Sequence, residues 1–253
     1  MLEGLEVTEI TKSDLERTYR IDSEFYTKEN IQVIKTLEKH PLNNLTHLVK
    51  VSDGNHMSIS ENFIEKGIPY YRGQDIHQYF IEDSNPICID EKTFSEPMMR
   101  RSHLKEGDVL LSIVGTIGGV SLVSSNKDAT CSCKLAIFRP EKTDGYFLSM
   151  FLRSKYGQNQ IKKFTRGAVQ MGLILEDMNQ IMVSGLSKSF QNIIRKLVEE
   201  AKGKSIIAVQ KYSQSETLLL QSIGLQNFKP SEEAVNIKSF KDSLGATGRL
   251  DAE

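Results

Sequence analysis

Residues 247–253 read Thr-Gly-Arg-Leu-Asp-Ala-Glu, and they repeat the pattern of residues 18–24, Thr-Tyr-Arg-Ile-Asp-Ser-Glu. When residues 6–24 are placed over residues 235–253, six positions are identical, whereas average composition gives about one identity in such a window. The repeat indicates that one structural unit ends near residue 230 and that a second copy then begins. The sequence therefore favours either part of a two-unit protein or a single unit that gains its second copy by dimerising.

Length and composition place the chain among ordinary globular proteins. It has 253 residues, of which 39% are hydrophobic and 26% charged, which is enough chain for one large domain or two small ones. No apolar run approaches the roughly 18 residues of a membrane span, and the acidic start of the chain is unlike a secretion signal. The three cysteines are too few for a disulfide framework. We therefore expect a cytoplasmic protein.

Two of the cysteines stand close together. Cys131 and Cys133 are two residues apart in an expected strand, where they would share one face. With no neighbouring histidine and no second pair of cysteines they make a weak metal pair, so we expect packing thiols. We expect the chain to bind neither a metal nor a cofactor.

The texture of the sequence changes along the chain. Apolar positions at helical spacing predict a helix over residues 24–39, which Pro41 ends. Short apolar runs between glycine, asparagine, aspartate and proline predict strands over residues 45–51, 69–72, 86–89, 109–114, 120–123 and 135–139. The next stretches predict a helix over residues 145–164 and a short connection over residues 173–183.

Residues 187–223 contain no proline and predict one long helix. Side chains at a spacing of three and four form a seam, which is typical of a helix that pairs with another helix. Lys204 and Ser215 interrupt the seam, and Gly203 costs the helix on the order of 1 kcal/mol. The pattern favours a paired spacer helix over one that packs only on its own domain, and Gly224 is expected to end it. The seam positions are Phe190, Ile194, Leu197, Ala201, Ala208, Leu219 and Ser222.

The net charge of the chain is −1, but its basic residues are unevenly spread. Residues 151–175 contain no acid, and their lysines and arginines lie among aromatic and amide side chains. Such a stretch is typical of phosphate contact, because basic groups that neutralise phosphates release counterions. A solvated helix face is the alternative.

Several segments together resemble a known family. Residues 67–76, Gly-Ile-Pro-Tyr-Tyr-Arg-Gly-Gln-Asp-Ile, and residues 107–118, Gly-Asp-Val-Leu-Leu-Ser-Ile-Val-Gly-Thr-Ile-Gly, resemble the target recognition domain of type I restriction-modification specificity subunits. Residues 133–140, Cys-Lys-Leu-Ala-Ile-Phe-Arg-Pro, resemble the strand that follows, and residues 157–170 resemble the segment that leads towards the conserved helix. The resemblance runs through the chain in order, up to the restarted Arg-Leu-Asp-Ala-Glu.

The resemblance implies an α+β fold, with a strand-rich target recognition domain followed by a long spacer or coiled-coil helix. The expected parts are a DNA-binding domain over residues 1–186, the spacer and dimerisation helix over residues 187–224, and a linker with the start of a second repeat unit over residues 225–253. Specificity subunits of this family carry two recognition domains, joined by two antiparallel helices, and each domain reads half of a split DNA target. This chain matches one half, as a natural half-subunit, a truncated reading frame or an engineered fragment would.

The resemblance also implies partners. They are double-stranded DNA, methyltransferase subunits that carry the cofactor and flip the base, restriction subunits, and a second copy of the chain paired through the long helix. No membrane is implied.

The expected DNA contacts are polar side chains on loops, because arginine pairs with guanine, and asparagine or glutamine with adenine, in the major groove. For Arg72 a structural ion pair with Asp75 is an equal alternative. Lys162 and Lys163 are assigned to phosphate rather than to base contacts. The candidate DNA-binding residues are Asn55, His56, Ser58, Arg72, Gln74, Thr116, Lys134, Lys162, Lys163, Arg166 and Gln170.

An enzyme is the rival interpretation. The chain has no Asn-Pro-Pro-aromatic motif of the kind an amino-methyltransferase uses to hold a flipped base. Residues 115–119, Gly-Thr-Ile-Gly-Gly, lack the spacing of a dinucleotide site, and neither His56 nor His103 has a metal spacing or a nearby nucleophile. We therefore assign no catalytic residue and expect a non-catalytic subunit. Two alternatives stay open: a nucleotide- or nucleic-acid-modifying enzyme with its site at the glycine turns, and a coiled-coil assembly protein without DNA affinity.

Overall fold

The computed structural model describes residues 7–12, 15, 21–167, 171–227 and 229. The chain divides into two compact units, Met1–Glu200 and Ala201–Glu253. The second copy of the repeat, residues 235–253, and the matching residues 18–20 lie outside the described part of the chain.

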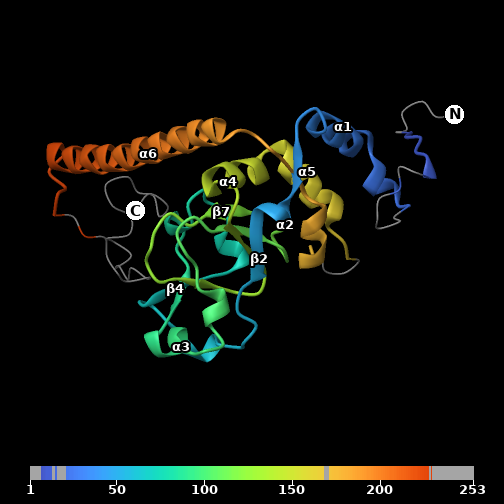
Figure 1. Ribbon diagram of the computed structural model, residues 1–253. Helices are drawn as coiled ribbons and strands as arrows, with labels where there is room; N and C mark the ends of the chain where they lie inside the picture. Colours follow the sequence, from blue (N-terminus) through green and yellow to red (C-terminus); the bar gives the residue numbers. More distant parts are fainter. Residues whose placement is uncertain (1–6, 13–14, 16–20, 168–170, 228, 230–253) are drawn as a thin grey trace, which may run out of the picture. The chain divides into compact units, whose positions relative to one another are not determined.

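The first unit mixes short strands with helices, which confirms the α+β class (Figure 1). The helices and strands are α1 (Lys28–Leu37), β1 (Leu42–Asn44), α2 (Leu45–Leu48), β2 (Val49–Asp53), β3 (Phe63–Ile64), β4 (Ile68–Tyr71), β5 (Ile87–Ile89), α3 (Glu91–Ser95), β6 (Val109–Ser112), β7 (Val120–Leu122), β8 (Thr130–Cys131), β9 (Leu135–Pro140), α4 (Gly145–Arg153), α5 (Lys155–Phe164), β10 (Met182–Ser184) and α6 (Lys188–Ser222). Single turns of 3₁₀ helix are η2 (Ser23–Tyr26), η3 (Ser60–Asn62), η4 (Gly73–Asp75), η5 (Ile81–Asp83), η6 (Arg100–Ser102) and η7 (Leu175–Gln180).

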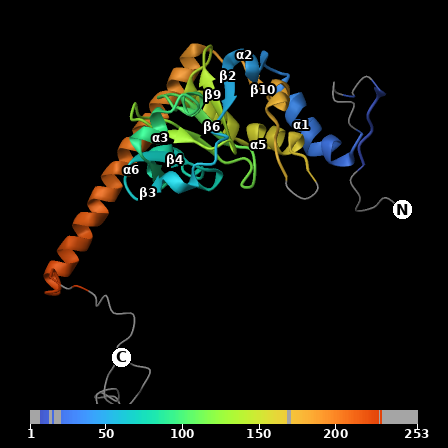
Figure 2. The same ribbon diagram turned by 90° about the horizontal axis from the view of Figure 1, so that it is seen from below.

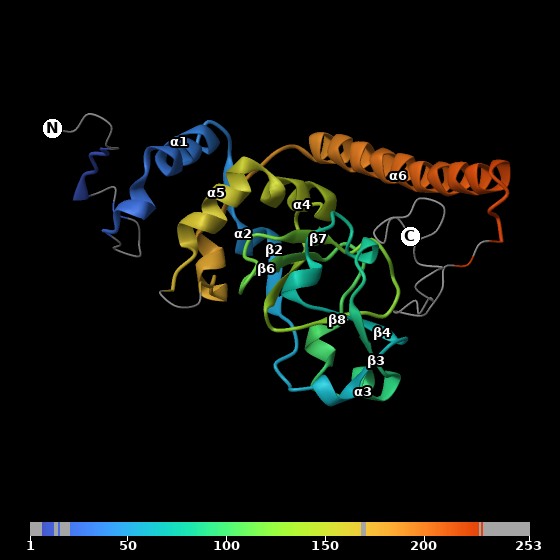
Figure 3. The ribbon, with the colours of Figure 1, turned by 180° about the vertical axis from the view of Figure 1, so that it is seen from behind.

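The strands of the described residues form two four-stranded sheets and one strand pair. The main sheet has the order β2-β9-β6-β7 and is antiparallel throughout, with Val51 opposite Phe138 and Leu110 opposite Ile137. The second sheet has the order β3-β5-β4-β8, in which β4 and β8 run parallel. Figure 3 shows α4 beside β7 and, away from α4, the strands β4 and β3 with α3.

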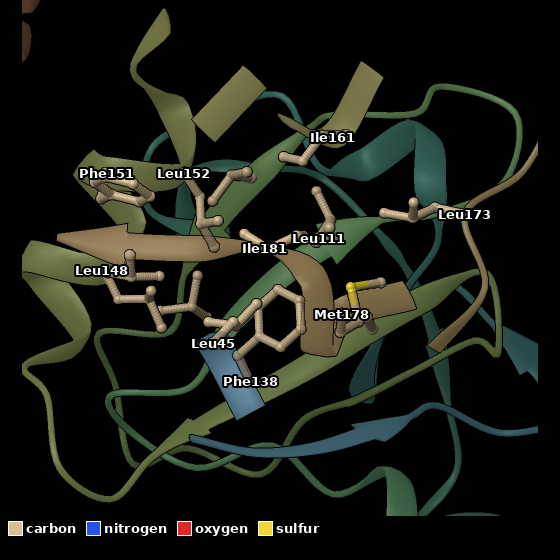
Figure 4. Packing of buried hydrophobic residues seen from close by; sticks show 14 of the residues in the cluster. Leu45, Leu111, Phe138, Leu148, Phe151, Leu152, Ile161, Leu173, Met178 and Ile181 are labelled. Atoms are coloured by element: carbon tan, nitrogen blue, oxygen red, sulfur yellow. The ribbon is translucent and has the colours of Figure 1, made fainter. Parts of the chain in front are cut away.

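The main sheet is buried on both faces. On one face Leu111 and Phe138 pack with Leu148 and Leu152 of α4 and with Ile181 (Figure 4). On the other face a second cluster joins it to the second sheet and contains Tyr71, Ile81, Leu110, Leu135 and Ile137. Burial on both faces explains why these strands are almost continuously apolar in the sequence. Each such buried side chain contributes roughly 1.5–3 kcal/mol.

The first helix, α1, lies beside α5 (Figure 2), and in the preceding turn, η2, the ring centre of Phe25 is 5.7 Å from that of Phe164 in α5. It begins at Lys28 rather than at Glu24, because the Thr27 side chain accepts a hydrogen bond from the Asn30 amide and caps the helix there.

Two predicted elements are wrong in detail. The strand predicted over residues 45–51 is a helical turn, α2, as far as Leu48, since Leu45 is fully buried and donates its N–H to the carbonyl of Ile181. The helix predicted over residues 145–164 is two helices, because Ser154 is extended and its side chain caps α5. An extended residue inside a helix breaks the hydrogen-bond ladder, so α4 and α5 pack in different directions.

The long helix α6 runs from Lys188 to Ser222, within a residue of the predicted bounds. Its 35 residues correspond to about 50 Å of length. Gly224 follows with φ of 72°, the Leu225 N–H donates to the carbonyl of Leu220 at 2.8 Å, and the Gly224 N–H donates to that of Gln221 at 3.1 Å. These two bonds form the Schellman arrangement, which confirms that Gly224 ends the helix. No helix among the described residues has both the length and the apolar character to cross a membrane.

The first turns of α6 contact the rest of the first unit. The Arg195 guanidinium pairs with the Asp144 carboxylate and lies over the Tyr146 ring, with its Cζ 4.6 Å from the ring centre. The Gln191 side chain accepts a hydrogen bond from the Asp144 amide at 2.9 Å, while Ile194 packs against the main core. Polar and apolar contacts together therefore hold the first two turns of α6 against the first unit.

Candidate nucleic-acid interface

A groove of about 540 Å³ lies where four separate segments of the first unit meet. It is formed by residues 57–63, the end of β4 with η4, the loop after β6, and the turn between β8 and β9. Of the residues predicted to contact DNA, it brings together Ser58, Arg72, Gln74, Thr116 and Lys134. These five are distant in the sequence, so the fold places them on one surface.

The segment Arg72–Asp75 forms one wall of the groove. The Asp75 carboxylate accepts hydrogen bonds from the Arg72 amide at 2.8 Å and from its Nε at 3.3 Å. The ion pair considered for Arg72 is therefore present. Gln74, between the two, is exposed.

The loop after β6 forms the next wall. Gly115 and Gly118 have φ of 80° and 92°, a backbone region that other residues rarely adopt, and the Gly118 N–H donates to the Ser112 carbonyl at 3.0 Å. The two glycines thus form a tight hairpin between β6 and β7. Thr116 is exposed at its tip and donates a hydrogen bond to the Gly73 carbonyl at 2.8 Å, which ties the two walls together.

The floor of the groove is apolar, which the sequence did not reveal. It includes Met57 and Phe63, which remain 40% and 37% exposed, and the buried Tyr70. Burial raises the pKa of Tyr70, although its hydrogen bond with the Asn55 side chain acts in the opposite direction, so the phenol stays neutral at physiological pH. Lys134 is exposed at the rim, and the described residues place no carboxylate within ion-pair distance of it.

Two candidates next to the groove have structural partners. Asn55 is buried, and its amide bonds to the backbone N–H and C=O of Met57, at 2.8 and 3.0 Å. We therefore remove Asn55 from the direct DNA contacts, because its hydrogen-bonding groups are already used. His56 is exposed and its Nε2 lies 2.5 Å from the Asp53 carboxylate, which Arg101 also contacts.

Fewer basic side chains of residues 151–175 are free to contact phosphate than the composition of that stretch suggested. Lys162 is exposed, but Lys163 is buried with its Nζ 4.1 Å from the centre of the Phe25 ring. We therefore remove Lys163 from the phosphate contacts. Arg166 forms an ion pair with Asp177, and Arg153 donates to the Val120 carbonyl.

Arg166 is linked to the groove through backbone pairing. The backbone of Arg166 pairs with Gly172, and Gly172 pairs in turn with Val114, a residue of the groove. Gly172 therefore connects the backbone of Arg166 to the wall of the groove at Val114. Gln170 lies outside the described residues.

The groove offers several kinds of group that can bind a ligand. Arginine, glutamine, lysine and hydroxyl groups surround an apolar floor, and these are the groups that match base edges, thymine methyls and phosphates. The three cysteines are free, and the described residues contain no cluster of histidine, cysteine or acidic side chains that could hold a metal ion.

Comparisons with known proteins give the fold. No family model matches the chain, and no curated protein matches its sequence. Among solved structures, the S subunit of a type I restriction-modification system from M. genitalium matches with a TM-score of 0.50 and 15% identity, over 71% of this chain and 45% of its own. A chain from a structure on the assembly and conformational transition of the type I R-M system matches with a TM-score of 0.50 and 17% identity, over 79% and 50%. The fold is that of a type I S subunit.

This S-subunit fold accords with the resemblance seen in the sequence. A third structure, the HsdS subunit from Thermoanaerobacter tengcongensis, matches with a TM-score of 0.48 and 16% identity over 79% of this chain and 49% of its own. The chain thus spans about half the length of the structures it matches.

Proposed function

We propose that this chain is the DNA sequence-recognition subunit of a type I restriction-modification complex and reads one half of a split double-stranded target. The observation that carries the proposal is the groove, in which an S-subunit fold gathers Ser58, Arg72, Gln74, Thr116 and Lys134 around an apolar floor. Loops on a rigid scaffold are the usual carriers of such contacts.

The groove residues have different roles in this proposal. Arg72, Gln74, Ser58 and Thr116 contact base edges, whereas Lys134 joins the exposed Lys162 in positioning the phosphate backbone. The chain itself is non-catalytic. It directs methyltransferase subunits, which supply the chemistry, and restriction subunits to the site.

A salt series on duplex binding tests the proposal. The chain, alone and with its methyltransferase subunits, is titrated with a random duplex library at several salt concentrations, and bound sequences are recovered. We expect enrichment of one sequence and an affinity that falls linearly on a log–log plot against salt.

Two outcomes would contradict the DNA-recognition role. One is the absence of binding even with the methyltransferase subunits, which favours an assembly protein without DNA affinity. The other is methylation of DNA by the purified chain and S-adenosylmethionine alone, which favours an enzyme.

We also propose that α6 pairs antiparallel with α6 of a second copy. Most large apolar side chains of this helix are exposed, including Leu197 at 56%, Tyr212 at 75% and Leu219 at 60%. Exposed apolar side chains on one helix face favour a partner helix, and closed two-fold assemblies are the commonest arrangement of identical chains. Sedimentation that finds only monomer, both at tens of micromolar and within the assembled complex, contradicts this pairing.

A further inference from the structure

The side chain of Arg72 is only partly used by the fold. Its Nε donates to Asp75, but among the described residues neither terminal nitrogen, Nη1 or Nη2, has a hydrogen-bond partner. The side chain is 32% exposed and lines the groove. A guanidinium held through Nε presents its two terminal N–H groups outward as a pair.

The backbone that carries Arg72 is held from two sides. Asp75, whose side chain is 8% exposed, bonds to the Arg72 backbone N–H as well as to its side chain. Thr116 bonds to the carbonyl of Gly73, and a Cβ on Gly73 would lie 3.0 Å from the Ser112 hydroxyl. Little conformational freedom is therefore left to lose when a ligand binds.

We propose that Arg72 reads a guanine in the target half-site, with Nη1 and Nη2 donating to its O6 and N7, and that Asp75 is the positioning residue for that contact. This inference rests on the proposed DNA-recognition function and names the base that the groove reads. The ion pair with Asp75 and the base contact then occur together, because they use different nitrogens of the same guanidinium.

Guanine fits this geometry better than a phosphate does. Two donors in a fixed fork match the two acceptors that guanine shows in the major groove, and no other base presents two acceptors there. The apolar floor supports the same choice, because Met57 and Phe63 are partly exposed in the same groove and suit the edges of neighbouring bases rather than a hydrated phosphate.

The test compares base preferences of variants in the complex of the full chain with its methyltransferase subunits. A random duplex library first gives the wild-type target. Arg72→Lys and Arg72→Ala should each lose the preference for guanine at one position, by on the order of 10-fold or more, and keep the preferences at the others. Asp75→Asn should lower the same preference and leave the rest.

An atomic substitution in the DNA separates base reading from a structural role. Replacing the guanine at that position by 7-deazaguanine removes the N7 acceptor, so it should weaken wild-type binding on the order of 10-fold and have little effect on Arg72→Ala. Likewise, the double variant Arg72→Ala with Asp75→Asn should bind like Arg72→Ala alone, with the same base preferences and the same affinity. If Asp75 has a purely structural role, the second substitution should lower the affinity further, and equally for all sequences. Thermal melting of each variant confirms folding, and Arg72→Gln replaces any variant that does not fold.

Arg101→Lys is the matched control, because Arg101 also pairs with a buried aspartate but is not part of the groove. It should leave every base preference unchanged. If Arg72→Lys and Arg72→Ala weaken binding uniformly across sequences, Arg72 contacts a phosphate and the inference is wrong, while the DNA-recognition function stands. If the wild-type complex enriches no sequence, the proposed function itself fails and this inference fails with it.

Discussion

At the scale of single residues, two adjacent lysines show how the fold separates similar side chains. Lys162 is exposed, whereas Lys163 is buried against Phe25 and Phe164. Both stand in the same basic stretch, and the sequence assigned both to phosphate contacts. The structure distinguishes them because neighbouring positions of a helix lie about 100° apart around its axis.

This difference leads to a prediction for the pair. Lys162→Ala should weaken duplex binding equally for all sequences and reduce the slope of log affinity against log salt by about one. Lys163→Met should leave that slope unchanged, because its ammonium lies over an aromatic ring rather than in solvent. Binding titrations at four or five salt concentrations measure both slopes, and equal losses from the two substitutions would refute the assignment.

A second residue-scale prediction concerns the Asp108–Arg139 pair. Asp108 is 1% exposed, and Arg139 contacts both of its carboxylate oxygens, at 2.9 and 2.7 Å. Arg139→Ala leaves a buried carboxylate without its cation, so we expect unfolding free energy to fall by about 3 kcal/mol. Urea denaturation followed by circular dichroism measures the change.

The control for that prediction is Arg101→Ala. Arg101 is 55% exposed, and its partner Asp53 keeps His56 as a second contact. Its loss should cost about 1 kcal/mol or less. Equal costs for the two substitutions would mean that the exposure of the arginine and a second partner for the carboxylate do not decide the effect.

The candidate site was only partly predictable at this scale. Residue type pointed to Arg72, Gln74 and Thr116, because arginine, glutamine and threonine between turns are typical of DNA contacts. Burial, which depends on distant packing, was invisible, and it decided against Asn55 and Lys163. The apolar floor was missed because Met57 and Phe63 carry no local signal that distinguishes a groove from a core.

At the scale of elements, the strands with both faces buried were predicted well, since continuous apolar runs between turn residues have few other structures. β6, β7 and β9 lie within the predicted ranges to within two residues. The turn of helix at Leu45–Leu48 could not be predicted, because a short apolar run suits a strand and a buried helical turn equally. The contact that decides it, from Leu45 to Ile181, joins residues far apart in the chain.

One glycine inside α6 and one just after its end lead to a prediction at the scale of elements. Gly203 lies inside the helix with open space around it, whereas Gly224 has φ of 72°. Gly203→Ala should therefore stabilise the helix by about 1 kcal/mol, and Gly224→Ala should destabilise its last turn by a similar amount. Helical circular dichroism during thermal melting measures both, and a shift of the same sign for the two substitutions would contradict the assignment.

At the scale of the whole molecule, the division into a recognition domain, a spacer helix and the start of a second unit remains a prediction. So does the assembly. If two copies pair through α6, two identical recognition domains read an inverted repeat separated by unread base pairs. The length of α6 would then set this separation.

Deleting seven residues from the middle of α6 tests whether the helix length sets the separation between the half-sites. Each heptad spans about 10 Å, which is about three base pairs of duplex, so the preferred gap should shorten by about three while each half-site stays unchanged. Methylome sequencing of cells that express the chain with its methyltransferase reads the gap directly. A continuous methylated site, or a gap that does not respond to the deletion, would refute the half-subunit arrangement.

The contacts of Asp144 with Gln191 and Arg195 have a consequence for hybrid proteins. They fix the rotational phase of the first turns of α6, because the polar groups of one residue hold two positions a helical turn apart. A chimaera joined at residue 186 would combine a new domain with a helix whose phase its surface does not specify. A junction after Glu200 would instead transfer the first turns of α6 together with the domain that they contact. The contacts of Asp144 with Gln191 and Arg195, and with them the orientation of these turns, would then stay intact.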